Sequence, residues 1–466
     1  MIGGIERWNE KARAAVAGRA FFVVGIGVAQ MLDFQRLGGS IVGALSVLPS
    51  GGPPFAPSLD FPVLSLTGST RHIFDLVVND FATTISRNAP RVREVLEACD
   101  PDRRATVVSY LPVPSGPFGR REIWAQEAAV GQRLEHKRSL REILLGLLPA
   151  VPAIECTWPI DPGAWESAQA ELDAEVLVAQ HVGLSGGGMG TFVCPSHALA
   201  LHRLATLDGR PVRLMPWIDG TACNVMGHIL DQRRVITFPP SRQLVQPDAA
   251  GRPLYAGNVF GEAFSSAEIG AIQDELRALG RALAARGHRG PFGVDFLRTA
   301  RGARLYHDVN PRMNGSVDSL AHYLWDGIGS PLRTLLLARC PWSPEEMEAL
   351  EQVTAAAVAA APTWRFFMAK AVERPTRLDT IPRAGLWEVE PNAPAVRFVA
   401  AGGGPEGIVG QRALLEPTAP PGLGLLPRDS LVLGDLFCSA ELGHALEARH
   451  GAGAGQALLD AFLGVR

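Results

Sequence analysis

The most informative segment of the sequence is YHDVNPRMNG, residues 306–315. Asp308, Asn310 and Arg312 stand at alternate positions, and side chains two residues apart on an extended strand point to the same face. That face would be polar and of mixed charge, and an Asn-Gly turn follows it directly. Such a face is poorly suited to a hydrophobic core and well suited to holding a phosphate through a bound metal ion.

A second strand-like segment, FGVDFL, precedes the first one across an Arg/Gly-rich turn. If the two form a hairpin that turns at residues 301–302, Asp295 faces Asp308. Directly opposed residues have β-carbons about 4.5–5.5 Å apart. Two carboxylates about 5 Å apart repel by about 3 kcal/mol at an effective dielectric of about 20. We therefore expect a cation between them.

Asp295, Asp308 and Asn310 are the predicted metal ligands. Carboxylate and amide oxygens are hard ligands, which Mg²⁺ prefers together with water and substrate phosphates. In the same hairpin Gly293 faces Asn310, and its missing side chain would leave space for the cluster. Arg312 would offer a fixed fork to a phosphate or to a developing oxyanion.

The same segment also has a purely structural interpretation, because Asn-Pro and Asn-Gly pairs are typical of loops. In that case Asp295 and Asp308 would lie on solvated edges, and Arg312 would form a salt bridge with one of them. The sequence alone leaves both interpretations open.

Length and composition indicate an ordinary globular protein. The chain has 466 residues, 47% of them hydrophobic and 20% charged, which is enough for two to four domains with buried cores. The net charge is -3 and no long basic run is present, so the sequence argues against a nucleic-acid-binding protein. The only lysines are Lys11, Lys137 and Lys370.

Cysteine usage and hydropathy favour a cytoplasmic protein. The 6 cysteines are scattered without a CxxC pair, which is typical of reduced thiols. No apolar run reaches the roughly 18 residues that a membrane helix needs. The segment FFVVGIGVA near the N-terminus could imitate a signal peptide, but we expect a buried strand of an α/β domain there.

Strands and helices alternate in the first part of the chain. Strand-like runs lie at 19–28, 40–49, 61–66 and 105–114, with a helix around 88–98. This pattern predicts an open α/β domain over about 1–130.

The middle and last parts of the chain also mix both elements. Ser139 and Glu142 form a capping box, which predicts a helix beginning near residue 140. The further expected elements are strands at 175–182, 191–195, 212–218 and 223–230, a boxed amphipathic helix at 265–287, a helix near 344–361, strands at 385–390 and 430–437, and a final helix.

The segment GLSGGGMGT, residues 183–191, is rich in glycine and joins two expected strands. Closely spaced glycines let backbone N–H groups approach phosphate oxygens. The pattern is not a Walker A loop, because no Lys follows the last glycine and a strand comes next. We predict a hairpin lid over a triphosphate, and a plain flexible turn is the alternative. The candidate nucleotide-binding residues of the lid are Ser185, Gly186, Gly187, Gly188, Gly190 and Thr191.

Two further positions are candidates for nucleotide contacts. Pro216 interrupts an expected strand, and a proline cannot donate to a sheet. The segment could act as a hinge that offers the Pro216 C=O and the Ile218 N–H to an adenine edge. Lys137 lies just outside a helix N-terminus, where anions are favoured. A solvated surface lysine is the alternative.

Taken in order, these features resemble the ATP-grasp superfamily: a lysine before a helix, a glycine-rich hairpin, a hinge strand and a D…DxNxR pattern. The resemblance covers about residues 130–330, and the NPRMNG ending is most similar to pheganomycin-type peptide ligases. It implies an α/β (α+β) ATP-grasp fold with an N-terminal open α/β domain over 1–130. Two ATP-grasp subdomains, 131–210 with the lid and 211–340 with the metal site, would follow. A C-terminal mixed α/β domain, 341–466, would complete the chain.

The resemblance also implies roles for single residues. Lys137 would contact phosphate and Arg312 would act beside the transferring phosphate, both as catalytic residues. Gln180 stands where the family's second phosphate-binding lysine is usual, and Asp308 stands where its second metal ligand is usually Glu. Both departures put the usual contacts in doubt.

The activity implied is an ATP-dependent, Mg²⁺-dependent carboxylate–amine ligase that forms an acyl phosphate and releases ADP and phosphate. Its partners would be small-molecule acids and amines, of amino-acid or peptide-like type in natural-product biosynthesis, and a homodimer is compatible with the family. The alternatives are a non-catalytic nucleotide-binding regulatory protein with a degenerate fold, or an acyl-phosphate-forming enzyme with a non-amine acceptor. His72, Arg120 and Arg121 are possible substrate contacts, but we expect each of them to be structural or solvated.

Overall fold

A computed structural model provides the structure of the chain. The residues that it describes are 2–25, 33–47, 61–66, 81–136, 142–144, 146–182, 187–188, 190–248, 251–261, 264–317, 320, 323, 336–371, 376–378, 382–383, 385–391, 395–401, 408–417, 423–425 and 430–463. The predicted site residues Lys137, Ser185 and Gly186 lie outside these ranges, as do Ser139 and His72.

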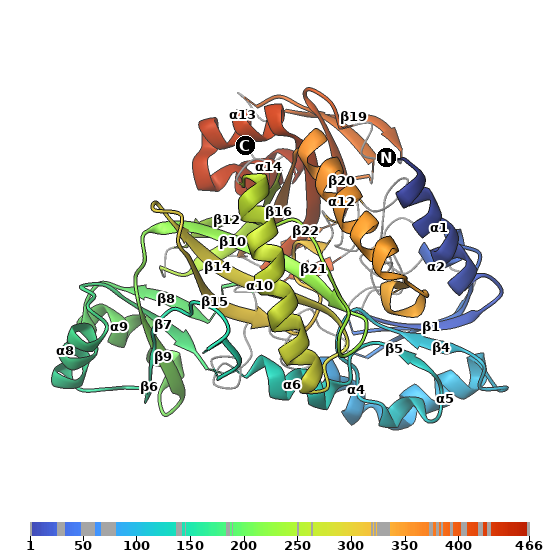
Figure 1. The fold of residues 1–466 in the computed structure, drawn as a ribbon, viewed down its shortest axis with the longest axis horizontal. Coiled ribbons are helices and arrows are strands. Elements are labelled where there is room, and N and C mark those ends of the chain that lie inside the picture. Colours follow the sequence, from blue (N-terminus) through green and yellow to red (C-terminus); the bar gives the residue numbers. More distant parts are fainter. Residues whose placement is uncertain are drawn as a thin grey trace.

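The N-terminal part forms a five-stranded parallel sheet, which confirms the predicted open α/β arrangement (Figure 1). Its strand order is β3-β2-β1-β4-β5. The strands are β1 (Ala20–Gly25), β2 (Ser40–Ser46), β3 (Val63–Ser65), β4 (Thr106–Val108) and β5 (Ile123–Trp124). The helices of this part are α1 (Ile2–Val16), α2 (Asp33–Arg36), α4 (Phe81–Arg87), α5 (Ala89–Cys99) and α6 (Ala128–Glu135), with a 3₁₀ turn at Gly116–Phe118.

Strand β1 is buried on both faces because helices cover each side of this sheet. Phe21 and Val23 pack with α1 and α2, whereas Phe22 and Val24 pack with α4 and α5. All four side chains have 0% exposure, as expected for a central parallel strand. The segment is therefore a core strand, as predicted.

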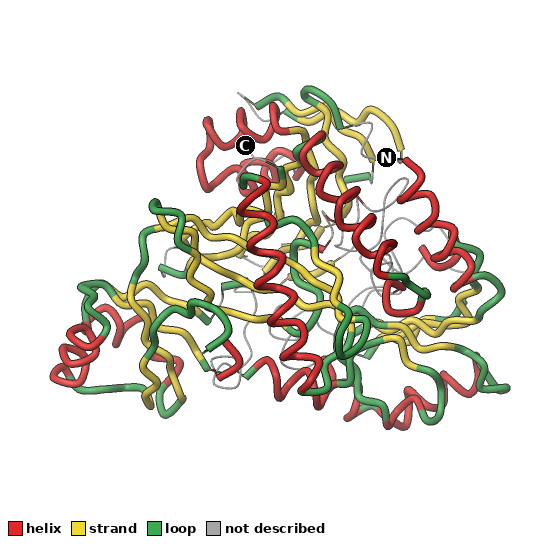
Figure 2. Tube along the Cα trace, viewed as in Figure 1, coloured by secondary structure: helices red, strands yellow, loops and turns green. Residues whose placement is uncertain are grey.

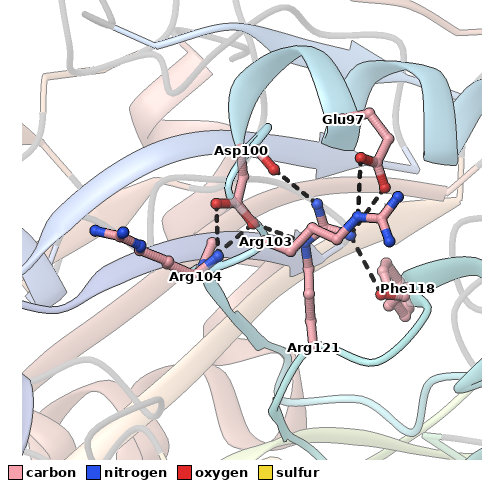
Figure 3. A network of polar contacts seen from close by, with 7 residues as sticks. Glu97, Asp100, Arg103, Arg104, Phe118 and Arg121 are labelled. Atoms are coloured by element: carbon pink, nitrogen blue, oxygen red, sulfur yellow. Dashed lines mark hydrogen bonds and ion pairs between the residues drawn. The ribbon is translucent and has the colours of Figure 1, made fainter.

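Arg121 is a structural residue of this domain (Figure 3). Its Nε donates to Asp100 Oδ2 at 2.7 Å and its Nη2 donates to the Asp100 carbonyl at 2.8 Å, with both side chains buried. Burial alone would raise the pKa of Asp100, but hydrogen bonds from Arg121 and from two backbone N–H groups lower it. The alternative of a substrate contact at Arg121 is wrong, since its guanidinium is committed to this network. Arg120 is exposed.

A small antiparallel sheet in the order β6-β9-β7-β8 forms a separate layer at one end of the molecule (Figure 1). Its strands are β6 (Ile154–Thr157), β7 (Leu177–His181), β8 (Thr191–Cys194) and β9 (Pro211–Pro216). Helices α8 (Pro162–Glu171) and α9 (His197–Arg203), with a 3₁₀ turn at Ala205–Leu207, pack on one face around a tryptophan-containing core. The predicted strands around the glycine-rich segment are confirmed as an antiparallel pair, β7 with β8.

The largest sheet has 11 strands and carries most of the yellow strands in Figure 2. The order is β15-β14-β10-β12-β13-β16-β22-β20-β18-β19, with β11 paired to β10. The first strands are β10 (Gly220–Ile229), β11 (Val235–Thr237), β12 (Ser241–Pro247), β13 (Pro253–Phe260), β14 (Gly290–Thr299) and β15 (Arg304–Asn310). The remaining strands are β16 (Thr363–Ala371), β18 (Gly385–Val389), β19 (Val396–Ala401), β20 (Arg412–Pro417) and β22 (Ser430–Ser439). Strands β17 (Thr376–Leu378) and β21 (Leu423–Leu425) pair with each other.

Helix α10 (Ser266–Ala285) lies across β10 and β14 (Figure 1). It begins with the predicted capping box, in which Ser265 Oγ accepts from the Glu268 N–H and the Glu268 side chain accepts from the Ser265 N–H. Val294 and Val309 of the sheet are fully buried beneath it. The opposite surface of β14 and β15 therefore remains for polar residues.

The C-terminal part extends the same sheet, because β16 pairs with β13. Helix α12 (Pro344–Ala360) contacts α1, and helices α13 (Ala440–His450) and α14 (Ala454–Leu463), joined by a 3₁₀ turn at Gly451–Gly453, pack on the C-terminal strands. One continuous sheet thus spans residues assigned to 211–340 and to 341–466. Within the described parts of the chain, none of the helices has the length and hydropathy of a membrane-spanning segment. All six cysteines are free.

Two buried histidines predict a pH-dependent stability. Burial, helped by the charges of His288 and Arg339, lowers the pKa of His228 to about 3. Burial also lowers the pKa of His288 to about 4, although its hydrogen bond to the Pro291 carbonyl acts in the opposite direction. Both rings stay neutral where an unfolded chain would bind protons, so their contribution is full above about pH 6.5 and is lost as the pH falls towards 4 and 3.

The free energy of unfolding, measured in urea, is expected to fall below pH 6.5 by about 1.4 kcal/mol per pH unit and per histidine. The variant His228→Leu should remove one of the two contributions to the slope of the free energy of unfolding against pH. The variant His202→Leu, at an exposed position of α9, should keep both. If the wild type and both variants lost stability equally with falling pH, the loss could not be due to His228.

Candidate active site

The hairpin of β14 and β15 has the predicted register where the site residues lie. Asp295 pairs with Asp308, and Gly293 pairs with Asn310. The register then shifts, so that Phe296 pairs with Tyr306 and His307 is the extra residue of a β-bulge. The prediction is confirmed at the acidic pair. The outer part of the hairpin differs by one residue.

The acidic pair lies in a polar environment, not on a solvated edge. Asp308 and Asn310 are 9% and 7% exposed, and both belong to β15 and not to a loop. Asp295 Oδ1 accepts from Asn224 Nδ2 and, at 3.0 Å, from Gln243 Nε2. Asn310 Nδ2 donates to Asp295 Oδ2 at 3.1 Å. The loop interpretation of this segment is wrong for Asp308.

This donor set fits a hard divalent cation. Two carboxylates face each other across a strand pair, and an amide stands next to them on the same face. The described residues contain no cluster of three or more His, Cys, Asp or Glu side chains that could hold a metal. The predicted set is of a different kind, because it combines two carboxylates with one amide. Rotation of the Asn310 amide would exchange its hydrogen bond to Asp295 for an oxygen ligand to the ion.

The space left by the missing side chain of Gly293 is occupied by Asn314, whereas the prediction assigned it to the metal cluster. A β-carbon at Gly293 would lie 1.9 Å from Asn314 Nδ2, so the missing side chain makes room for Asn314 and not for the metal cluster itself. Among the described residues this buried Nδ2 has no hydrogen-bond partner. An orphaned donor beside two carboxylates fits an anionic group that a metal ion brings to the site.

Arg312 is held in a fixed position by an ion pair. Its Nε pairs with Glu135 Oε1, and its Nη2 donates to Asn310 Oδ1 at 3.2 Å. The side chains of Arg312 and Glu135 are 13% and 8% exposed. The alternative salt bridge to an aspartate of the site is wrong, because the acidic partner comes from the end of α6.

The described residues Gly187 and Gly188 of the glycine-rich segment contact β13 of the large sheet. Gly187 and Gly188 have φ values of +61° and +82°, which favour glycine. The Gly187 carbonyl accepts from the Tyr255 N–H of β13 at 3.1 Å. A β-carbon at Gly188 would lie 2.0 Å from the Pro253 carbonyl, so only glycine permits this approach. Gly190 and Thr191 close the hairpin through backbone hydrogen bonds at its base.

Gln180 lies at the base of this lid and contacts an arginine. Its Nε2 donates to Thr191 Oγ1 at 3.3 Å, and its Oε1 accepts from Arg213 Nη2. The same Nη2 donates to the His307 carbonyl at 2.9 Å. Arg213 therefore links the lid strand β7 to β15, one residue before Asp308.

The predicted hinge lies where β9 leaves the small sheet. Pro216 is its last residue, and the Trp217 N–H donates to the Val176 carbonyl at 2.9 Å. Ile218 is half-buried and belongs to a small apolar cluster with Val151, Ala153, Met215, Val178 and Leu305. Its members come from the small sheet, from the segment before β6 and from β15.

Several residues that contact the candidate site were not predicted from the sequence. Asn224, Gln243, Glu135 and Arg213 each contact a predicted site residue directly, and none was predicted. Strands β12 and β13 were not predicted either, so the neighbours of Asp295 were unknown. The one available signal was Asn224 at a position that alternates with apolar residues in a predicted strand.

A second polar network supports the loop after β15. Arg365 of β16 donates to the Gly315 carbonyl and to Tyr255 Oη, the latter at 2.7 Å, and pairs with Asp435 at 2.8 Å. Ser316 Oγ donates to Asn224 Oδ1 at 2.7 Å. The C-terminal strands thus help to fix the residues beside the acidic pair.

Comparison with known proteins gives a likeness in fold. No protein-family model matches the sequence, and no curated protein matches it. The carboxyaminoimidazole ribonucleotide synthase of Aspergillus clavatus, complexed with ATP, has a TM-score of 0.57 at 14% identity over 98% of this chain and 100% of that chain. The biotin carboxylase domain of the Hydrogenobacter thermophilus 2-oxoglutarate carboxylase, complexed with MgADP, ADP and bicarbonate, has a TM-score of 0.59 at 13% identity over 92% and 88%.

The fold is ATP-grasp-like. The chain, with its N-terminal parallel sheet and two antiparallel sheets, matches these enzymes over nearly its full length. The N5-carboxyaminoimidazole ribonucleotide synthetase of Thermotoga maritima is also similar, with a TM-score of 0.54 at 12% identity over 92% of this chain and 98% of that chain. The predicted fold class is confirmed.

Proposed function

We propose that this protein is an ATP-dependent, ADP-forming ligase that joins a carboxylate to an amine through an acyl phosphate. The observation that carries the proposal is the opposed pair Asp295 and Asp308, with Asn310 beside it, on the polar face of one hairpin. A cation would offset the repulsion of such a pair, and the strands that flank the proposed lid and hinge, β7, β8 and β9, belong to one small sheet. The likeness to enzymes complexed with ATP and MgADP supports it.

The cofactor part of the proposal is Mg²⁺, with ATP as the phosphate donor. Asp295, Asp308 and Asn310 would hold the ion, and when bound it would neutralise charge on the phosphates. Gln180, the lid residues and Lys137 would contact the phosphates. The proposed phosphate contacts of the lid are Ser185, Gly186, Gly187, Gly188, Gly190 and Thr191.

The adenine would lie at the hinge. The Pro216 C=O and the Ile218 N–H would meet its polar edge, and the apolar cluster around Met215 would cover one face. The intervening Trp217 N–H donates to the Val176 carbonyl, just before β7, so the proposal assigns the adenine contacts to the groups on either side of it.

The proposed chemistry has two steps. An oxygen of the substrate carboxylate attacks the γ-phosphorus of ATP, the bond from this phosphorus to the bridging oxygen breaks, and ADP leaves. The amine nitrogen then attacks the acyl carbon, the acyl–phosphate bond breaks, and phosphate leaves while the amine gives up a proton. Arg312, fixed by Glu135, would stabilise the negative charge that develops in both steps. No side-chain nucleophile is required, and most of the catalysis would be positioning.

The direct test follows ADP and phosphate release in a screen of paired acids and amines. Stoichiometric ADP and phosphate that depend on both substrates are expected. Hydroxylamine should trap the acyl phosphate as a hydroxamate in the wild type and not in Asp308→Ala. AMP and pyrophosphate as products would refute the mechanism.

Two alternatives make different predictions in the same screen. An enzyme with a non-amine acceptor would release stoichiometric ADP and phosphate without needing an amine, and the bicarbonate in the Hydrogenobacter complex favours this alternative. A regulatory protein with a degenerate site would bind nucleotide and release no ADP. Asp308, one methylene shorter than Glu, and the neutral Gln180 are the features that favour the regulatory alternative.

Finer features belong to the same proposal. We propose amino-acid or peptide-like substrates of natural-product biosynthesis, following the resemblance to pheganomycin-type ligases, and a cytoplasmic enzyme without nucleic-acid partners. The division into 1–130, 131–210, 211–340 and 341–466 is also proposed. A homodimer would be recognised by light scattering coupled to size-exclusion chromatography.

A further inference from the structure

Arg213 is a buried arginine at the junction of the two sheets, and the proposed mechanism leaves it without a role. It lies in β9, directly opposite Gln180 of β7 and Glu155 of β6, and only 4% of it is exposed. Its Nη2 donates to Gln180 Oε1 and, at 2.9 Å, to the His307 carbonyl.

The contacts of Arg213 join the strand before the proposed lid to the strand that carries Asp308. Through Gln180, which donates to Thr191, it contacts the strands that carry the lid. Through the His307 carbonyl it contacts β15 beside Asp308. Its charge therefore lies between the lid and the acidic pair.

Two further arginines lie near the acidic pair. Arg312 pairs with Glu135, and Arg365 pairs with Asp435. A nucleoside triphosphate carries more negative charge than one divalent ion neutralises, while Asp295 and Asp308 add further negative charge. A positive charge close to the lid would offset this excess.

We propose that Arg213 and Gln180 form one phosphate-binding unit, in which Gln180 donates a hydrogen bond to the phosphates of a nucleotide and Arg213 supplies the positive charge. The carboxamide of Gln180 accepts from Arg213 through its oxygen, and this contact polarises the amide and orients its Nε2 towards the lid. The inference rests on the proposed function, since it presumes a nucleotide at this site.

The test is calorimetric binding of ATP, ADP and adenosine in the presence of Mg²⁺. Arg213→Gln should weaken ATP binding about 10- to 100-fold, the range for losing a charge-assisted hydrogen bond, and should leave adenosine binding within about 2-fold. Arg213→Lys should lose less than Arg213→Gln. The control Arg210→Gln removes the same charge from an exposed position nearby and should change neither the ATP affinity nor the adenosine affinity.

A charge swap keeps the test decisive if Arg213→Gln folds poorly. Gln180 and Arg213 face each other across β7 and β9, so the double variant Gln180→Lys/Arg213→Gln returns one positive charge to the same pair. It should recover most of the ATP affinity. Unfolding in urea, followed by far-UV circular dichroism, reports the fold of each variant.

The outcomes separate this inference from the proposed function. Unchanged ATP affinity in Arg213→Gln, or an equal loss for ATP and adenosine, would make Arg213 purely structural while the proposed function stands. A charge swap that folds and does not recover ATP affinity would also overturn the inference. A wild-type protein that binds no ATP would overturn both.

Discussion

The variant Asp308→Asn is expected to lose at least about 1,000-fold in the rate of ADP release while keeping its fold. A catalytic metal ion contributes several kcal/mol to the transition state, and each 1.36 kcal/mol is a factor of ten. The change also removes the repulsion from Asp295 across the hairpin, about 3 kcal/mol at most, so the free energy of unfolding without metal should not fall. The measurements are a coupled ADP assay and urea unfolding.

The effect of Mg²⁺ on thermal stability is a second test of whether Asp308 binds the metal. The wild type should gain thermal stability from Mg²⁺ with an ATP analogue, and Asp308→Asn should not. Asp274→Asn, at a side chain of α10 that is 81% exposed, should behave like the wild type. A Mg²⁺-dependent shift that survives in Asp308→Asn would argue against this metal site.

The variant Arg312→Gln is expected to lose about 100- to 1,000-fold in the same rate, the range for removing one donor to a developing charge. It should also unfold more easily, by about 3–5 kcal/mol, because the buried Glu135 loses its partner. Activity and stability would therefore fall together in the single variant.

The double variant Glu135→Gln/Arg312→Gln separates the two effects. Neither charge remains, so most of the lost stability should return, while the rate of ADP release should stay low. Recovery of the rate together with the stability would show that Arg312 acts only as a structural partner of Glu135.

The acidic pair could be predicted from the sequence because its causes are local. Side chains alternate along each strand, and a short turn fixes which residues face each other. The shift at His307 could not be predicted in this way. The bulge turns Tyr306 into the core beneath α10, next to Phe296, while Asp308 keeps its polar face. Core packing, which is a tertiary property, therefore decides the register beyond the site.

Other parts of the site depend on contacts between distant segments. Glu135 and Arg312 are 177 residues apart. Gln243 reaches Asp295 from β12, a strand that the pattern did not reveal and that lies beyond β10 in the sheet. The C-terminal strands illustrate the same point, because the sequence gives no sign that β16 pairs with β13. Short-range patterns predict the elements, and the neighbours of each side chain follow only from the assembled sheets.

The most direct measurement is the position of the metal ion in a crystal structure with Mn²⁺ and a non-hydrolysable ATP analogue, located by anomalous scattering. The account predicts a peak within about 2.0–2.3 Å of carboxylate oxygens of both Asp295 and Asp308. Bound nucleotide with no peak between these two side chains, or with the ion held elsewhere, would contradict it.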